Sequence, residues 1–229
     1  MSIAPETSTI AERFQAVASG HICDALEHVG IISPVLPETL RPLTSAVRFA
    51  GPAATLKLAR SRTENDSRRL NELLEDVAKA GDVLVIDAQG IMSAAVFGDR
   101  SGFVAKTLGS SGAVVNGGAR DIDGLEELQY PVHALGRALP ASEERLQGVE
   151  LNCDVIIGGV LIHPGDWLVG DDSGICVVPA ELLEQVLELA EEREEIDKDS
   201  FDQLRAGKTM REVHRHFKDD DIEQIRRTE

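Results

Sequence analysis

The chain has 229 residues, of which 42% are hydrophobic, so it is long enough to bury the core of one ordinary domain. Its net charge of -17 would repel phosphate backbones, and we therefore expect no nucleic-acid partner. Aromatic residues make up only 3%, which excludes a stacking surface for bases and leaves the core to Val, Ile, Leu and Ala.

The cysteine pattern and the N-terminal stretch indicate a cytoplasmic protein. Cys23, Cys153 and Cys176 are widely spaced and form no CxxC pair, so neither a disulfide framework nor a zinc site is indicated. The polar N-terminus has no basic segment followed by an apolar run, so we expect no signal peptide. No apolar run approaches the length of a membrane span, and no membrane partner is expected.

Apolar periodicity predicts two short helices between residues 8 and 30, with a break at Ser19-Gly20 and an end at Gly30. His21 and His28 lie seven residues apart on one predicted helical face. A metal pair is one interpretation, but no third ligand accompanies them, so surface packing and capping are favoured.

The next segment alternates irregular and regular structure. Residues 31–42 are Pro-rich and irregular, and residues 47–58 are expected to form two strands around a Gly-Pro turn. A polar loop at 61–66 follows. Ser67 is then expected to cap a helix at 68–80, which has Leu residues on its inner face.

Residues 81–123 carry the most informative pattern. Two apolar runs, within 82–87 and at 113–115, are typical of strands buried on both faces. A short helix is expected between them at 102–108. Asn116-Gly117-Gly118 is expected to be a flexible loop whose backbone amides can face a ligand.

Two acidic loop signals, Gly98-Asp99 and Arg120-Asp121, stand one strand-helix-strand unit apart, and we expect the fold to bring them together. Asp121 could simply cap the following helix, with Arg120 as its exposed neighbour. Alternatively, a carboxylate at the end of a strand binds a hard cation, and the adjacent guanidinium grips a planar oxyanion in bidentate fashion. The residues alone leave both interpretations open.

The rest of the chain is expected to alternate short strands and turns before a long helix. The expected elements are a helix at 122–128, a strand at 131–139, a strand pair at 152–162, a hairpin at 168–178, and a helix at 180–206 ended by Gly207. The Asp-Asp-Ser-Gly tip of the hairpin lacks the spacing of a calcium loop. We divide the chain into a catalytic domain, 1–179, and a C-terminal helical extension, 180–229, which is expected to contact a neighbouring subunit.

An ordered series of motifs resembles the RraA-like family: GDVLVIDAQG, AVFGD, AVVNGGARDIDGL and GGVLIHPGDWLVGDDSGICVVP. That family contains the class II 4-hydroxy-4-methyl-2-oxoglutarate aldolases, related oxaloacetate decarboxylases and the regulator of ribonuclease activity A. The resemblance runs from about Ile22 to about Gly207. It implies an α/β fold, a layered α-β-β-α sandwich of the swivelling β/β/α type with an added C-terminal helix, assembled as a homotrimer or a dimer of trimers.

The resemblance also implies roles for individual residues. Asp121 would be the one direct protein ligand of a Mg²⁺ or Mn²⁺ ion, and Arg120 would contact the oxygens of the substrate. Asp99 would orient metal-bound water. The backbone amides of one loop would hold the carboxylate of pyruvate; its residues are Gly98, Asp99, Arg100 and Ser101.

The implied activity is that of a metal-dependent lyase, a class II pyruvate aldolase that cleaves 4-hydroxy-2-oxo acids to pyruvate and decarboxylates oxaloacetate as a side activity. Many aldolases of the family have an acid where this chain has Gly124. Asp123 cannot be assumed to replace it, because one step along a helix turns a side chain by about 100°. In the aldolases a glutamate of a neighbouring subunit approaches the metal waters, and Glu194 or Glu195 is the candidate here.

Two other functions remain open at this stage. The chain could be a non-catalytic protein that binds and inhibits an RNA-processing ribonuclease, which Gly124 and the acidic surface favour and the long C-terminal helix does not. It could also be an enzyme of the same fold that acts on another sugar-derived oxo acid.

Overall fold

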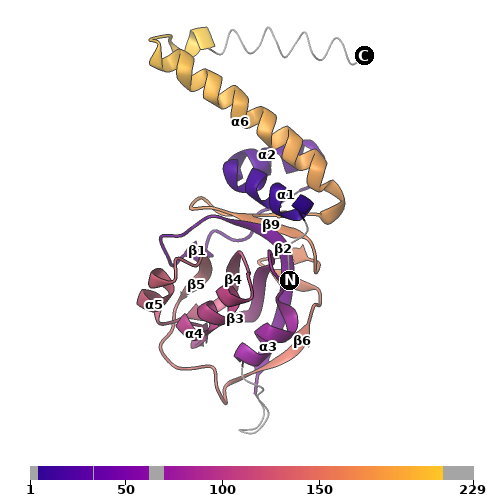
Figure 1. The fold of residues 1–229 in the computed structure, drawn as a ribbon, viewed down its shortest axis with the longest axis vertical. Helices are drawn as coiled ribbons and strands as arrows, with labels where there is room; N and C mark the ends of the chain where they lie inside the picture. Colours follow the sequence, from indigo (N-terminus) through magenta and orange to yellow (C-terminus); the bar gives the residue numbers. More distant parts are fainter. Residues whose placement is uncertain (1–4, 33, 62–69, 214–229) are drawn as a thin grey trace.

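The computed structural model of this chain describes residues 5–32, 34–61 and 70–213. It has a mixed α/β fold in which a curled eight-stranded sheet packs against helices (Figure 1). A separate hairpin is formed by β7 (Val155–Ile157) and β8 (Val160–Ile162). The α/β class is therefore confirmed, and the predicted cap at Ser67 lies outside the described residues.

The main sheet has the strand order β1-β5-β4-β3-β2-β9-β10, and β6 also pairs with β2. The strands of this sheet are β1 (Arg41–Pro42), β2 (Phe49–Arg60), β3 (Val83–Phe97), β4 (Gly112–Ala119), β5 (Val132–Arg137), β6 (Leu146–Leu151), β9 (Trp167–Gly170) and β10 (Ile175–Val178). The helices are α1 (Pro5–Ala16), α2 (Ser19–His28), α3 (Leu70–Val77), α4 (Asp99–Thr107), α5 (Ile122–Glu127) and α6 (Leu183–Arg205), with a 3₁₀ turn at Ala180–Leu182.

The central strands β2, β3, β4 and β5 run parallel, so their carboxyl ends lie at one edge of the sheet. Phe97 of β3 pairs with Ala119 of β4, which in turn pairs with Arg137 of β5. Three strands therefore end in one row. The segments that follow β3 and β4 begin at this edge, and ligands of open parallel sheets bind there.

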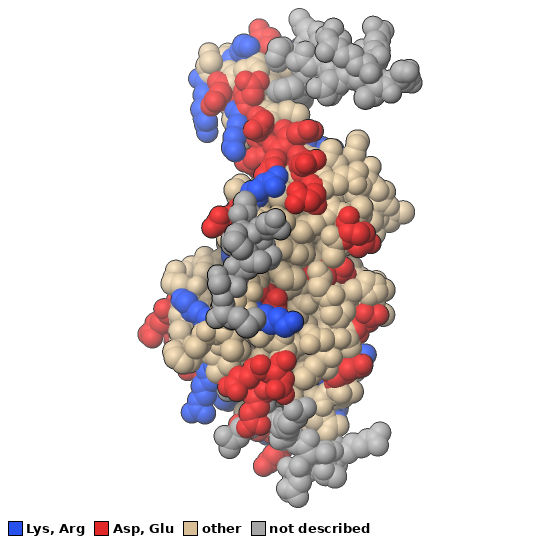
Figure 2. All heavy atoms as spheres, turned by 45° about the vertical axis from the view of Figure 1, so that its right-hand side comes forward, with Lys and Arg blue, Asp and Glu red and all other residues tan. Residues whose placement is uncertain are grey.

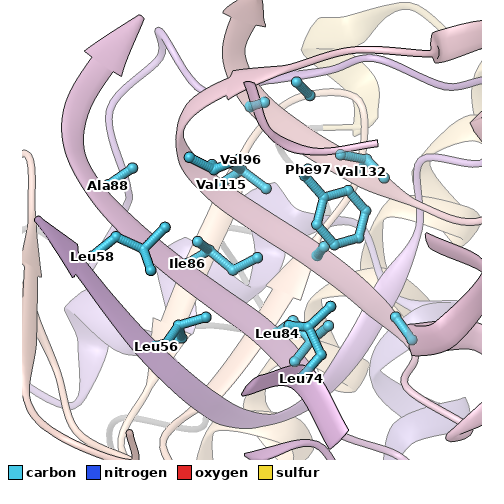
Figure 3. Packing of buried hydrophobic residues seen from close by; sticks show 14 of the residues in the cluster. Leu56, Leu58, Leu74, Leu84, Ile86, Ala88, Val96, Phe97, Val115 and Val132 are labelled. Carbon is cyan, nitrogen blue, oxygen red and sulfur yellow. The ribbon is translucent and has the colours of Figure 1, made fainter. Parts of the chain in front are cut away.

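The apolar run of β3 is buried on both faces, as expected. Leu84 and Ile86 face the helices α3, α4 and α5, in a cluster that includes Leu56 and Val115 of the neighbouring strands (Figure 3). Val83 and Val85 face the opposite cluster, which contains residues of the β7–β8 hairpin and of the segment before β1. Burial of this many aliphatic side chains on two faces fixes the position of the strand ends.

A third cluster joins the two ends of the chain. Phe14 and Val17, Ile22 and Leu26 of the N-terminal segment pack with Trp167 and Cys176 of the β9–β10 hairpin and with one face of α6. In Figure 1, α1 and α2 lie beside the first turns of α6, and α6 then projects away from the body. The apolar start of α6 thus packs against the N-terminal helices and the β9–β10 hairpin. We call α1, α2, α6 and the β9–β10 hairpin the helical layer.

The distal part of α6 is densely acidic, and Figure 2 shows red side chains gathered along the projecting helix. In the described ranges, no helix is both long enough and apolar enough to cross a bilayer.

Residues 47–58 do not form two strands around a Gly-Pro turn, and this prediction is wrong. They belong largely to one strand, β2, whose first part pairs with β9 and whose second part pairs with β3 and β6. Gly51 and Pro52 lie where β2 changes partners. A Cβ atom at Gly51 would lie 2.1 Å from the carbonyl oxygen of Gly81, so glycine marks a close backbone approach here.

Asn116-Gly117-Gly118 is not a loop, and that prediction is also wrong. These residues continue β4, which reaches Ala119. A Cβ atom at Gly118 would lie 2.5 Å from that of Ala138. The glycines therefore allow β4 to pack closely against its neighbours, and they do not present amides to a ligand.

The break between the first two helices also differs from the prediction. It lies at Val17 and Ala18, and Ser19 is already the first residue of α2. The carboxylate of Asp171 accepts hydrogen bonds from the backbone N–H and the hydroxyl of Ser19, at 3.0 and 2.7 Å. A side chain distant in sequence thus caps the start of α2, which local sequence patterns do not reveal.

Candidate active site

The ends of β3 and β4 place the two predicted acidic loops side by side. The backbone N–H of Arg120 donates to the carbonyl of Phe97 at 2.9 Å, so the two strand ends are joined directly above the loops. A Cβ atom at Gly98 would lie 3.2 Å from Oδ2 of Asp121 and 3.4 Å from Cγ of Arg120. Glycine at this position therefore leaves the space next to the Asp121 carboxylate open.

A pocket of about 120 Å³ opens at this edge of the sheet. Every residue predicted for the site lines it, and the segment after β5 closes one side. Its lining residues are Ala95, Val96, Phe97, Gly98, Asp99, Arg100, Ser101, Arg120, Asp121, Ala141, Ser142 and Glu143.

Asp121 has an unusual backbone conformation. It is the N-cap residue of α5, with φ 53° and ψ 45° in the left-handed region, and its side chain makes no capping hydrogen bond. For a residue other than glycine this conformation costs on the order of 1 kcal/mol, although aspartate tolerates it better than most. Asp121 stands at the position of a cap, but its carboxylate is not used as one.

The carboxylate of Asp121 instead faces Arg120. Nε of Arg120 lies 3.2 Å from Oδ2 of Asp121, and both side chains are partly exposed, at 41% and 45%. The ion pair is too exposed to contribute much to stability. It orients two groups of opposite charge at the mouth of one pocket.

The N-terminus of α4, with Asp99, Arg100 and Ser101, also lines the pocket. Backbone amides in the first turn of a helix have no carbonyl partner four residues earlier within that helix. The amide of Arg100 donates to Oδ1 of Asp99 at 2.6 Å. The amides and the helix dipole make this wall suitable for a carboxylate ligand.

Gly124 lies directly against Asp99. A Cβ atom at position 124 would lie 2.8 Å from Cβ of Asp99 and 3.4 Å from its Oδ2. Any side chain here would have to displace Asp99. Gly124, which breaks the pattern of the aldolases, therefore allows α5 to support the orientation of Asp99.

The donor set fits a hard cation that keeps most of its water. Asp121 offers one carboxylate beside an open space, and Asp99 lines the same pocket. No group of three or more His, Cys, Asp or Glu side chains able to hold a metal occurs in the described part of the chain. A closed zinc site is therefore not formed there, and one or two carboxylates with water suit Mg²⁺ or Mn²⁺.

The family model of Aldolase/RraA matches residues 19–177, which contain all of these site residues. The chain belongs to the Aldolase/RraA family. The match spans the sheet except for the last residue of β10, and it leaves α1 and α6 outside.

Two relatives of this chain carry the name "Putative 4-hydroxy-4-methyl-2-oxoglutarate aldolase". The Halalkalibacterium halodurans protein is 35% identical over 81% of this chain and 83% of its own length. The Burkholderia mallei protein is 39% identical over 73% of this chain and 98% of its own length. At this identity the names support a lyase-type enzyme within the family.

A solved structure points to the other branch of the family. The Streptomyces coelicolor protein RraAS2, described as an unusual member of the RNase ES inhibitor RraA protein family, superposes with a TM-score of 0.75 and is 29% identical. The superposition covers 87% of this chain and 98% of that one. The RraA-like fold is therefore confirmed.

The segment after β5 contributes to the pocket and was missed from the sequence. Ala141, Ser142 and Glu143 line it, and the backbone N–H of Ala95 donates to the carbonyl of Pro140 at 2.7 Å. A signal was present, because a polar segment that follows a third strand must begin at the same edge as the first two loops.

The two glutamates expected to reach a neighbouring site differ in their surroundings. Oε2 of Glu194 accepts a hydrogen bond from the backbone N–H of Ala18 at 3.3 Å and lies 3.7 Å from Nε2 of His21. Glu194 thus binds the N-terminal helices of its own chain. Glu195 is exposed on α6.

His21 and His28 do not form a metal pair in this structure. Nε2 of His21 lies 3.3 Å from Oδ2 of Asp197, and His28 is exposed, so His21 contributes to the packing of α2 against α6.

The acidic tip of the β9–β10 hairpin also has a structural role. Its first residue, Asp171, is buried and binds Ser19 as described above.

Proposed function

We propose that this chain is a divalent-metal-dependent lyase that cleaves 4-hydroxy-2-oxo acids to pyruvate, with oxaloacetate decarboxylation as a side activity. The observation that carries the proposal is the state of Asp121. Its backbone is held in the left-handed region, its side chain does not cap α5, and its carboxylate stands beside Arg120 at the mouth of the pocket. A costly backbone conformation at a residue whose side chain makes no capping hydrogen bond is typical of a functional residue.

Arg120 and α4 would bind the 2-oxo acid end of the substrate. The planar guanidinium can donate two parallel hydrogen bonds to the carboxylate and keto oxygens. The amides at the start of α4 would hold the carboxylate from the other side. Both walls belong to the same pocket, so the reacting half of the substrate would be fixed at two points.

Asp121 would hold Mg²⁺ or Mn²⁺, with Asp99 close by. When bound, such an ion supplies Lewis-acid stabilisation of the negative charge that develops on the keto oxygen as the neighbouring carbon–carbon bond breaks. The guanidinium of Arg120 would donate hydrogen bonds to the same keto oxygen. The presence of a guanidinium and a cation site on one wall supports enolate chemistry over hydrolysis by a lone acid.

Asp99 would act as the general base for the proton of the C4 hydroxyl. In a retro-aldol cleavage the C4 hydroxyl loses its proton, the O–H electron pair forms the C4 carbonyl of the second product, and the electron pair of the C3–C4 bond becomes that of the enolate. Asp99 would accept the hydroxyl proton through a water and return it by the same route to C3 of the enolate, which gives pyruvate. Decarboxylation of oxaloacetate forms the same enolate and needs no such base. This chemistry would take place in an assembly that we propose to be a homotrimer or a dimer of trimers.

The test is a pyruvate-release assay on purified protein with oxaloacetate and a set of 4-hydroxy-2-oxo acids, with Mg²⁺, with Mn²⁺ and with EDTA. We expect pyruvate from at least one 4-hydroxy-2-oxo acid and from oxaloacetate, and loss of both activities with EDTA. Release that is unaffected by EDTA would contradict the metal, and no release from any substrate would contradict the lyase.

A second candidate is a non-catalytic protein that binds a ribonuclease. It is favoured by the likeness to the RNase ES inhibitor family member and by the acidic surface of α6 (Figure 2). Purified RNase ES with a defined RNA substrate distinguishes the two. Inhibition of RNA cleavage together with no pyruvate release would select this candidate.

A further inference from the structure

Arg137 lies at the same sheet edge as the candidate site but is not among the residues that line the pocket. It is the last residue of β5 and pairs in register with Ala119, the residue before Arg120. The backbone N–H of Ala138 donates to the carbonyl of Ala119 at 2.9 Å, which fixes this register at the strand ends. The third strand of the row therefore ends in a cation beside the Arg120-Asp121 pair.

A second hollow, of about 460 Å³, adjoins the pocket on this side. It shares Arg120 and Asp121 with the pocket and continues past them to Arg137 and Leu139. Because the two spaces share Arg120 and Asp121, a substrate that is longer than its 2-oxo acid half can continue from the pocket into the hollow.

The hollow is lined by two cations, Arg120 and Arg137, and by two carboxylates, Asp121 and Asp123. Arg137 is exposed, and within the described residues its guanidinium has no hydrogen-bond partner and no carboxylate in ion-pair range. Arg120 already faces Asp121 at 3.2 Å. Arg137 thus remains available, and an unpaired guanidinium binds a carboxylate through two parallel hydrogen bonds.

A further hollow, of about 490 Å³, adjoins the pocket at α4 and is the alternative exit. It shares Asp99 and Arg100 with the pocket but is otherwise lined by Phe103, Val104, Gly124, Glu127 and Leu128. It has two carboxylates for one cation and several apolar side chains, so it is less suited to a carboxylate than the Arg137 side, where cations and carboxylates are equal in number. Arg100 remains its only cation among the lining residues.

We propose that Arg137 is a specificity-determining residue that binds the carboxylate on the non-pyruvate half of a dianionic substrate, so the site prefers such substrates to equally long monoanionic ones. The inference rests on the proposed function for the identity of the reacting half. It goes beyond that function because it assigns the other half of the substrate to a named residue.

The test compares ligands that differ only in the distal group. Calorimetry in Mg²⁺ measures the binding of 2-oxoglutarate and of 2-oxopentanoate, which cannot be cleaved. Pyruvate release measures kcat and KM for 4-hydroxy-2-oxoglutarate and 4-hydroxy-2-oxopentanoate. The variants are Arg137→Met, Arg137→Lys, Arg100→Met, and a control, Arg41→Met, which removes an exposed cation from β1, a strand that pairs with β5.

We expect Arg137→Met to weaken binding of 2-oxoglutarate, and kcat/KM for its hydroxy analogue, about 30-fold, as the loss of a charge-assisted pair of hydrogen bonds implies. The effect on both methyl-ended compounds should be less than about 2-fold by the same reasoning, because they make no such bonds. Arg137→Lys should restore part of the preference, and Arg41→Met should change nothing. Exchange of the methyl protons of pyruvate in D₂O reports the reacting half alone and should be unchanged in all of these variants except Arg100→Met.

Several outcomes would overturn the role of Arg137: equal loss on both ligands, no loss, a loss produced instead by Arg100→Met, or a changed oligomeric state by light scattering. Failure of the proposed function gives a different result. Wild-type protein would then show no turnover and no proton exchange, while a preference for 2-oxoglutarate that depends on Arg137 would still support the binding role. If neither ligand binds, both proposals are wrong.

Discussion

The acidic residues of the candidate site and those of the helical layer differ in their bonding partners. In the helical layer each of the acids that faces the packing has a partner: Asp171 binds Ser19, Glu191 pairs with Arg13 at 2.6 Å, and Glu194 caps Ala18. At the sheet edge, Asp99 and Asp121 are partly open to solvent and Asp121 has a strained backbone. The carboxylates of the helical layer link its helices to one another, whereas the fold keeps those at the sheet edge open to solvent.

The pKa directions support this contrast. Although burial opposes it, hydrogen bonds from Ser19 and Ser173 and the charge of Arg48 lower the pKa of Asp171 below its usual value. A hydrogen bond from Arg13 lowers the pKa of Glu191 in the same way. These acids are committed to the charged form in the folded state. The contrast therefore predicts that substitutions at the edge affect activity more than stability, and that substitutions in the helical layer do the reverse.

The largest effect is expected for Asp121→Asn. Asparagine tolerates the left-handed backbone, so the free energy of unfolding should change by less than about 0.5 kcal/mol. The loss of the proposed metal ligand should lower metal-dependent pyruvate release about 1,000-fold, which corresponds to about 4 kcal/mol of transition-state stabilisation. Calorimetric titration with Mn²⁺ should show weaker binding independently of activity.

Asp123→Asn is the matched control, since Asp123 is an exposed acid two residues further along the same helix. It should retain metal binding, and its activity should not fall, although Asp123 lines the neighbouring hollow. If Asp121→Asn keeps its activity, or if Asp123→Asn loses it to the same extent, the site is wrongly assigned.

A smaller loss is expected for Gly124→Ala. Alanine favours a helix over glycine by about 1 kcal/mol, so α5 should not be weakened by its own propensity. Its methyl group would nevertheless lie 2.8 Å from Cβ of Asp99 and must shift that residue. Because displacement of a catalytic group by a fraction of an ångström is costly, we expect kcat to fall about 10-fold.

Gly20→Ala provides the comparison for Gly124→Ala. A Cβ atom at Gly20, in α2 of the helical layer, would meet nothing within 4 Å. This variant should raise stability slightly and leave kcat unchanged. Equal kcat in the two variants would mean that Gly124 does not position Asp99.

The smallest effect on activity, and a clear one on stability, is expected for Asp171→Asn. The neutral side chain cannot accept all the hydrogen bonds of the carboxylate, which should cost about 1–3 kcal/mol in urea unfolding at pH 7. Since the pKa of Asp171 is lowered by folding, its contribution is present above the unfolded pKa of about 3.9 and is lost as pH falls below that value. The difference between wild type and variant should therefore shrink by pH 3.

The adjacent Asp172→Asn removes the same charge from an exposed residue and should change stability little at either pH. A pH-independent difference for Asp171→Asn would show that its hydrogen bonds do not depend on the charge. If this variant loses kcat per folded molecule, the helical layer affects activity as well as stability, and the contrast between the two regions is wrong.

The sequence predicted much of this molecule correctly because the signals were local. The apolar runs of β3 and β4, the hairpins of the C-terminal half and the apolar start of α6 follow from periodicity and from turn residues. The strand-helix-strand spacing also led us to expect that the Gly98-Asp99 and Arg120-Asp121 loops meet, and in the structure Asp99, Arg120 and Asp121 line one pocket.

Glycine was the least reliable signal. The pattern suggested a turn at Gly51 and a loop at Gly117-Gly118, but each of these glycines lies inside a strand where another chain segment approaches closely. Sequence alone cannot distinguish a glycine needed for a turn from one needed for close packing, since the neighbouring segment is distant along the chain.

The sequence by itself thus determined the fold class, the apolar core strands, the long C-terminal helix and the residue types of the candidate site. Only the tertiary structure decided that the side chain of Asp121 does not cap its helix, that Gly124 faces Asp99, and that Arg137 ends in the same row as Phe97 and Ala119. The reason is physical. Secondary structure depends on side chains a few residues apart, whereas strand register and the approach of α5 to α4 depend on contacts between segments that only packing brings together.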